Sequence, residues 1–376
     1  MQKTIFTSNW FLLAGIAGLI LFAGWIGRIN HQADKNRHLQ QYFSGADHTF
    51  SAVNSNKWQF WAAENELSGF IYSGTGKGYN GPLEVIIQTD TLGIILSIVS
   101  VLHSETPSYY EKLNKRGFFS GLLNKQAVDF LEGNPVDIVS GATLTSEAVV
   151  QAIRQGYAKG EGIQLEKRPI TAGATELFVI VLLLSGWFLS RMKNSKTRKL
   201  LLSLSLVLSA VILGFVFNIP ITLARFTTLL LGYLPEIGQN MAVLILLSGS
   251  ILLTLFTGKN IYCHSVCPFG ATQEGLAKLA GAKPWQPTRH KLWKKFQWGA
   301  TLIILLAALC LGNPNITQYE VFGAVFKLTG STLLLIGAML VVLASLFVKR
   351  FWCRFLCPVD GVFAYIKLLR GTLFRI

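Results

Sequence analysis

The chain has 376 residues; 51% of them are hydrophobic, only 14% are charged, and the mean hydropathy is +0.44. This composition excludes an intrinsically disordered chain and indicates a membrane protein. The formal net charge is +15, so the position of the basic residues decides whether they face nucleic acid or lipid headgroups.

The first apolar segment, 10–27, contains no charged residue and approaches the roughly 20 residues that a helix needs to cross a bilayer. Lys3 before this run also fits a secretory signal peptide. We favour an uncleaved N-terminal transmembrane anchor over 1–30, because the apolar run is long for a signal and no clear cleavage site follows it.

The next part of the chain, 31–168, is more polar and long enough for one small α+β domain. Apolar and polar residues alternate over 83–89, which predicts a strand. A tight turn is expected at 90–93, and a continuous apolar strand then runs to His103.

Short helices are expected at 107–117 and 122–132. Gly74, Gly76 and Gly78 superficially resemble a nucleotide-binding loop. The strand-then-helix context of such a loop is missing, so we interpret these glycines as a flexible connection.

The segment Asp137-Ile-Val-Ser-Gly-Ala-Thr143 leads into a run, 146–157, whose apolar residues have helical spacing. A helix N-terminus offers free backbone N–H groups and a partial positive charge, which together favour a phosphate. Gly141 and Ala142 keep the approach to this terminus open. The local pattern alone also fits an ordinary Ser/Thr helix cap.

In its wider context the segment resembles the flavinylation motif of the FMN-binding domain family, and the resemblance covers residues 69–160. It implies that a flavin transferase attaches FMN through its phosphate to the hydroxyl of Thr143. A His-x-Glu-Thr segment borders the flavin in that family, although here it also fits a strand end with a surface acid. The residues expected to contact or shape the FMN site are Thr143, Asp137, Ser140, Gly141, Ala142, Thr145, His103, Glu105 and Thr106.

Further apolar segments follow in the remaining part, 169–376. The shortest, 177–190, reaches spanning length only if 170–176 is included. We therefore expect a five-span membrane domain here and, with the anchor, an α-helical polytopic membrane protein of about six spans. The four clear spans of this part are 200–224, 237–258, 297–319 and 328–348.

Six spans place the inserted α+β domain on one side of the membrane and the segments 1–9, 191–199, 259–296 and 349–376 on the other. These four segments carry 19 of the 34 Lys and Arg residues but only two acids, Glu274 and Asp360. The positive-inside rule makes this the cytoplasmic side of a bacterial inner membrane, and the FMN domain extracytoplasmic. Membrane lipids are then the partners of the basic loops, and nucleic-acid binding is not needed to explain the charge.

Two short cysteine motifs recur after the fourth and the sixth expected spans. Cys263 and Cys267 are followed by a proline, as are Cys353 and Cys357, and a lysine stands four positions before each first cysteine. The repeat suggests a duplicated unit whose two copies pack side by side. Cysteines four apart face the same way on a helix, so two units would supply four thiolates.

Four thiolates suit an iron–sulfur cluster, and C-x-x-x-C-P is the closing fragment of the bacterial ferredoxin run. A structural zinc site of four cysteines remains an alternative, whereas disulfides are disfavoured on a reducing cytoplasmic face. Lys259, Lys349, Lys278 and Arg354 would offset the negative charge of the site. Cys310 stands alone in an apolar span and is interpreted as a buried hydrophobe.

The flavin motif, the six spans and the paired cysteine motifs together resemble the NosR/NirI family of membrane flavoproteins. NosR-type members continue into a cytoplasmic ferredoxin domain. Because this sequence ends 19 residues after Cys357, the short form associated with reductive dehalogenases (RdhC/PceC type) is the closer analogue.

The resemblance implies transmembrane electron transfer. An iron–sulfur centre, expected to be a 4Fe-4S cluster, and a covalent FMN would link a quinol or cytoplasmic donor to an extracytoplasmic reductase or other electron carrier. A redox-sensing regulator or maturation factor for a partner reductase is the alternative function, and the sequence does not separate the two. Whether the chain is itself an enzyme, with quinol oxidoreductase activity, is likewise left open by the sequence.

The hydrocarbon core of about 30 Å between the two expected sites is too wide for one efficient electron hop. A bound quinone, a flavin domain folded down onto the bilayer, an additional cofactor or a further protein would bridge it. All six histidines lie outside the apolar spans, so they cannot hold a haem in mid-membrane. Arg225, Tyr319 and Glu320 suit either a quinone pocket or simple interfacial anchoring.

Overall fold

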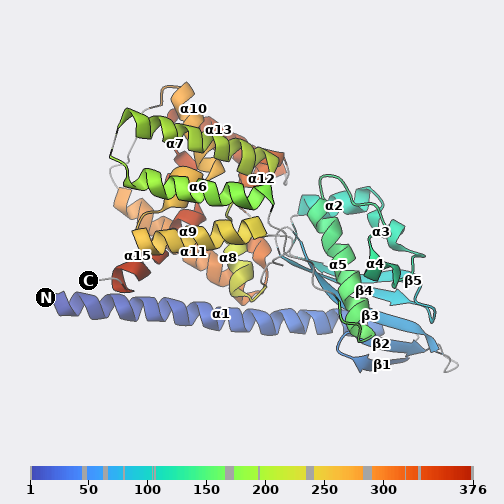
Figure 1. Ribbon diagram of the computed structural model, residues 1–376. Coiled ribbons are helices and arrows are strands. Elements are labelled where there is room, and N and C mark those ends of the chain that lie inside the picture. Colours follow the sequence, from blue (N-terminus) through green and yellow to red (C-terminus); the bar gives the residue numbers. More distant parts are fainter. Residues whose placement is uncertain are drawn as a thin grey trace.

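The computed structural model describes most of the chain. The described residues are 2–44, 49–61, 67–78, 81–103, 105, 107–165, 173–193, 195–233, 241–282, 290–317, 319–328 and 332–373. Figure 1 shows a small sheet domain beside a bundle of helices, with the long first helix running along the bundle and ending at the sheet domain.

The sheet domain is an antiparallel meander with helices on one face (Figure 1). Its five strands pair in sequence order and are β1 (Thr49–Asn54), β2 (Lys57–Trp61), β3 (Leu67–Lys77), β4 (Pro82–Thr89) and β5 (Ile95–His103). Its helices are α2 (Pro107–Lys115), α3 (Phe118–Leu122), α4 (Asp129–Glu132) and α5 (Thr143–Gly160). Strand β4 is almost wholly buried, and Leu83, Val85 and Ile87 share one apolar core with Val149 and Ile153 of α5.

The prediction of a flexible connection at Gly74 to Gly78 is wrong, because Gly74 and Gly76 lie inside β3. A side chain at either position would collide with α5: a Cβ atom would stand 2.0 Å from the carbonyl oxygen of Ala152 at Gly74, and 1.7 Å from that of Ala148 at Gly76. The glycines therefore let α5 pack directly on the strand backbone. This close packing fixes where the first residue of α5 lies.

Within the described residues, four helices are long and apolar enough to cross a membrane. Their spanning portions are Trp10–Asn30 of α1 (Gln2–Ser44), α6 (Ala174–Arg191), Lys196–Val216 and Lys291–Cys310 of α11 (His290–Cys310). The third consists of α7 (Lys196–Leu208) and the π-helix η1 (Ser209–Val216). Two further apolar helices, α9 (Met241–Thr257) and α13 (Thr332–Phe347), are shorter.

Short helices lie between and after these spans. They are α8 (Leu223–Leu230), η2 (Tyr262–Val266), α10 (Pro268–Leu279), η3 (Pro314–Thr317), α12 (Phe322–Lys327), α14 (Phe351–Phe355) and α15 (Pro358–Leu373). The order of long helix, short helix, apolar helix and cysteine motif occurs twice, as the duplication predicts.

Two of the expected spans end earlier than the sequence indicated. The helix expected over 200–224 stops at Val216, and the helix expected over 297–319 stops at Cys310. Asn218, with φ 50°, and Gly312, with φ 61°, adopt left-handed backbone conformations that turn the chain after each helix. The segments that follow fold back against the helices, which hydropathy alone does not distinguish from a continuing span.

Substitution of Gly76 by Ala tests the close approach of β3 and α5. Because the new Cβ would meet a backbone carbonyl, we expect a loss of about 2 kcal/mol in the free energy of unfolding of the sheet domain. Hydrogen exchange of α5 amides in the full-length protein measures this loss. Gly133→Ala is the matched control, since nothing lies within 4 Å of a Cβ at Gly133; equal protection in both variants would contradict the packing described here.

Candidate functional site

Each cysteine motif is divided between two short helices. Cys263 lies within η2, whereas Cys267 is the N-cap residue of α10 and is followed by Pro268 at the first helical position. The backbone N–H of Gly270 donates to the Sγ atom of Cys267 over 3.4 Å. The second motif repeats this division, with Cys353 in α14 and Cys357 directly before α15.

The expectation that both cysteines of a motif lie on one continuous helix is therefore wrong. Pro268 and Pro358 lack a backbone N–H and favour the first turn of a new helix, so each ends the short helix before it. The second thiol of each motif thus belongs to a helix N-terminus, where backbone N–H groups stabilise negative charge.

All four cysteines line one cavity of about 240 Å³. Among the described residues, no group of three or more His, Cys, Asp or Glu side chains is placed to hold a metal ion. Four thiols around one cavity match the number of protein ligands of a four-iron cluster, in which each iron takes one thiolate. The donor set therefore fits an iron–sulfur cluster.

Burial raises the pKa of all four cysteine thiols, that of Cys353 to about 12. The neutral thiol is then favoured at pH 7 until a metal centre replaces the protons. A bound centre also requires compensating positive charge nearby, because four thiolates bring four negative charges into a largely buried site.

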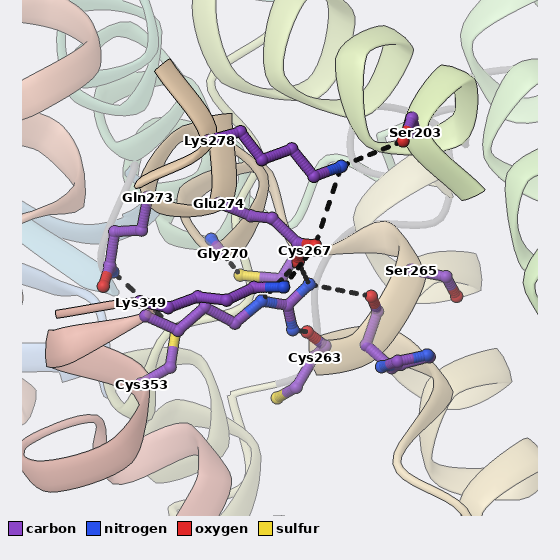
Figure 2. Close-up of polar contacts among 12 residues, drawn as sticks. Ser203, Cys263, Ser265, Cys267, Gly270, Gln273, Glu274, Lys278, Lys349 and Cys353 are labelled. Atoms are coloured by element: carbon purple, nitrogen blue, oxygen red, sulfur yellow. Dashed lines mark hydrogen bonds and ion pairs between the residues drawn. The ribbon is translucent and has the colours of Figure 1, made fainter. Parts of the chain in front are cut away.

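A partly buried ion pair ties the two motifs together, as Figure 2 shows around Glu274. Arg350, three positions before Cys353, approaches Glu274 of α10 to 2.6 Å and also donates from Nη1 to the carbonyl oxygen of Cys263 over 2.8 Å. Lys349 lies 3.0 Å from the same carboxylate. Although burial would raise it, the pKa of Glu274 is lowered by these two cations.

Two glutamines complete the support of the second motif. Gln273 accepts a hydrogen bond from the backbone N–H of Trp352 and approaches the Sγ atom of Cys353 to 3.7 Å through Nε2. Gln297 of α11 donates to the carbonyl oxygen of Cys357 over 2.7 Å. Arg350 and both glutamines were not predicted from the sequence, since none belongs to the C-x-x-x-C-P pattern. For Arg350, its position beside Lys349, directly before the motif, could have indicated a role at the site.

The basic residues predicted to offset the charge of the cysteine site contact different partners. Lys278 lies 3.8 Å from Glu274 and donates to Ser203 over 3.0 Å, as Figure 2 shows. Lys259 donates to the carbonyl oxygen of Ser190 at the end of α6, and Arg354 lines the cysteine cavity. Cys310 ends α11, apart from the other four cysteines.

Thr143 is the first residue of α5, and its side chain is exposed. Gly141 before it has φ 79°, a conformation that favours glycine. The loop is held from inside the helix, because the hydroxyl of Ser146 accepts from the N–H of Val139 and donates to the carbonyl oxygen of Ala142. The helix N-terminus and the Thr143 hydroxyl are thus exposed together on the surface of the sheet domain.

The other residues predicted for the FMN site lie on different sides of this turn. Asp137 and Ser140 are exposed in the loop, while Thr145 is buried and donates to Glu105 over 2.8 Å. Glu105, wholly buried, braces the first turn of α5 from behind. His103 stacks on Tyr110 of α2 with 4.0 Å between ring centroids, and burial lowers its pKa. Thr106 lies outside the described residues.

A second cavity, of about 250 Å³, opens beside Thr143. Gly141, Ala142 and Thr145 line it together with Tyr109 and Lys112 of α2. Its remaining wall comes from the helical part, from residues 216–218 at the end of η1 and from Lys327 at the end of α12. Lys112 and the wall formed by residues 216–218 and Lys327 were not predicted from the sequence, because they lie far from the Thr143 motif along the chain.

Glu320 is buried and accepts a hydrogen bond from the N–H of Leu223 over 3.0 Å, at the start of α8. Its burial raises its pKa to about 8. Tyr319 packs 6.3 Å from the ring of Trp352, beside the second cysteine motif. The interpretation of Glu320 as an interfacial anchor is therefore wrong, since its carboxylate is buried among the helices and accepts a hydrogen bond from the N–H at the start of α8.

Two known domains match this sequence in the regions just described. Residues 78–158 match the FMN-binding domain, and residues 239–286 together with 331–376 match the 4Fe-4S binding domain. The first match contains Thr143 and α5, and the second contains all four clustered cysteines. No solved structure shows significant similarity to the chain.

Several known proteins are similar in sequence to parts of the chain. Protein NirI of Paracoccus denitrificans (strain Pd 1222) is 29% identical over 218 residues, which is 52% of this chain and 31% of NirI. YccM of Escherichia coli (strain K12) is 27% identical over 157 residues, 38% of this chain and 43% of YccM. A component of the ion-translocating oxidoreductase complex of Vibrio vulnificus (strain YJ016) is 30% identical over 108 residues, 26% of this chain and 51% of that component. The chain thus spans a third to a half of the length of these relatives.

The chain combines an FMN-binding domain with a 4Fe-4S binding domain on apolar helices of membrane-spanning length. It is a homologue of NirI and YccM, and the resemblance to NosR/NirI-type FMN proteins is confirmed.

Replacing Arg350 with Ala tests the link between the cysteine motifs. The substitution leaves Glu274 with fewer cations, so we expect a loss of about 3 kcal/mol in stability and a lower iron content per chain. Thermal unfolding and iron analysis of the purified protein measure both. Arg116→Ala, an exposed arginine of the sheet domain, is the control; an unchanged iron content in Arg350→Ala would show that the pair is dispensable.

Proposed function

We propose that this protein transfers electrons between an iron–sulfur cluster on Cys263, Cys267, Cys353 and Cys357 and an FMN bound covalently to Thr143. It would link a quinol or cytoplasmic donor to an extracytoplasmic reductase or other acceptor. The observation that carries the proposal is that both cysteine motifs open into one cavity, in a chain that also contains an FMN-binding domain.

When bound, the cluster supplies one-electron exchange and the flavin supplies one- or two-electron exchange. The protein holds four thiols around one cavity, and the cation of Arg350 there favours the thiolate forms of Cys267 and Cys353. At the other site, the exposed hydroxyl of Thr143 is available to a flavin transferase. The N-terminus of α5 and the ammonium group of Lys112 then stabilise the phosphate.

The relatives support a role in electron transfer. YccM is named for electron transport, and the Vibrio vulnificus relative is named as part of an ion-translocating oxidoreductase complex. The excess of Lys and Arg in the segments around the cysteine motifs supports a cytoplasmic position for the cluster and an extracytoplasmic position for the FMN domain, in a bacterial inner membrane.

Thr143→Ala is expected to abolish covalent flavin, because it removes the oxygen that forms the phosphoester. The denatured band should lose its ultraviolet fluorescence after co-expression with a flavin transferase. Thr91→Ala, which removes an exposed hydroxyl from a distant turn, should keep full fluorescence. Fluorescence that survives in Thr143→Ala would disprove the attachment site.

Cys353→Ser is expected to lower iron and acid-labile sulfide to background, because each cysteine supplies one ligand. Cys310→Ser is the matched control and should retain both, since Cys310 lies outside the cavity. Metal and sulfide analysis of anaerobically purified protein measures the outcome. Stoichiometric zinc without sulfide in the wild-type protein would overturn the cluster.

A further inference from the structure

The cavity beside Thr143 has walls from two parts of the chain. One wall is the FMN-binding domain, with Thr143 and Lys112, and the other is the helical part, with Phe217, Asn218 and Lys327. Figure 1 shows the same arrangement, in which α2 and α5 face the end of the bundle where α12 lies. A molecule attached to Thr143 and seated in this cavity would therefore lie against both parts.

The chemistry of this cavity suits a planar anionic ligand. Its charged side chains are the two ammonium groups of Lys112 and Lys327, which approach from opposite walls, and the described residues that line it include no carboxylate. Phe217 and Tyr109 supply aromatic surface between them. A phosphate with an attached aromatic ring system combines the charge and the flat apolar area that such a lining favours.

The second wall also borders the cysteine cavity. Ile221 and Phe322 line the cavity of the four cysteines, while Asn218 and Lys327 line the cavity at Thr143. The three steps of chain from Asn218 to Ile221 span at most about 11 Å between Cα atoms. The five steps along α12 from Phe322 to Lys327 rise about 7.5 Å along the helix.

The two segments of this wall are packed together. Phe326 of α12 contacts Phe215 of η1 with 5.1 Å between ring centroids, and a Cβ at Gly214 would stand 2.6 Å from the ring of Phe326. Phe322 packs on Phe269 of α10, the helix that begins at Cys267. The two segments, 218–221 and 322–327, thus form one packed wall, and each of them contributes lining residues to both cavities.

We propose that the flavin site is shared: Lys327 and residues 216–218 of the membrane domain form its second half, and hold the FMN of Thr143 next to the cysteine cavity. This inference rests on the proposed attachment of FMN to Thr143. It makes Lys327 a binding residue for the phosphate or for the reduced, anionic ring. It also places the two cavities on opposite sides of the wall that segments 218–221 and 322–327 form.

The test measures how far the attached flavin is shielded in the full-length, flavinylated protein. Acrylamide is the quencher, because a neutral molecule does not respond to the charge that the variants remove. Lys327→Glu should raise the quenching constant of flavin fluorescence at least about twofold, since repulsion of the phosphate opens the shared site. Lys327→Gln should give a smaller rise, and Lys125→Ala, an exposed lysine of the same domain as Thr143, should give none.

The outcomes separate this inference from the proposed function. A fluorescent denatured band in every variant, with increased quenching only in the Lys327 variants, supports the shared site. Equal quenching in wild type, Lys327→Glu and Lys125→Ala overturns the shared site and leaves the attachment at Thr143 intact. A wild-type protein without a fluorescent band after co-expression with the transferase overturns both.

Discussion

The contact of Arg350 with Glu274 and with the carbonyl oxygen of Cys263 is the interaction on which the cysteine site depends. It joins a residue of the second repeat to two residues of the first. Together with the hydrogen bond from the Trp352 N–H to Gln273, it holds the two cysteine pairs beside one cavity. Partly buried ion pairs fix geometry more than they add stability, which suits a site whose four ligands must keep their spacing.

The flavin end of the molecule is positioned by packing. Gly74 and Gly76 allow α5 to approach β3, Glu105 braces the first turn of that helix from behind, and Thr143 is left at its exposed start. The same turn faces the ends of η1 and α12 across a cavity. Local rigidity of the sheet domain therefore determines where a group on Thr143 meets the membrane helices.

Much of this arrangement could be predicted from the sequence. The helix after Thr143 and the pairing of the cysteine motifs follow from periodicity and from duplication, which are local signals. The role of Gly76 could not be predicted, because its reason is a backbone carbonyl 72 residues away in the chain. The early ends of the helices at Val216 and Cys310 were also missed, since segments that turn back into the bundle are as apolar as a continuing span.

Both repeats would bind one shared cluster, in a cavity that segments 218–221 and 322–327 separate from the flavin of Thr143. An electron cryomicroscopy map of the flavinylated protein in lipid nanodiscs would show both groups at once. We expect a single compact density that touches Cys263, Cys267, Cys353 and Cys357, and a flat density that extends from Thr143 toward Lys327. Separate metal densities at the two motifs, or a flavin directed into solvent, would contradict it.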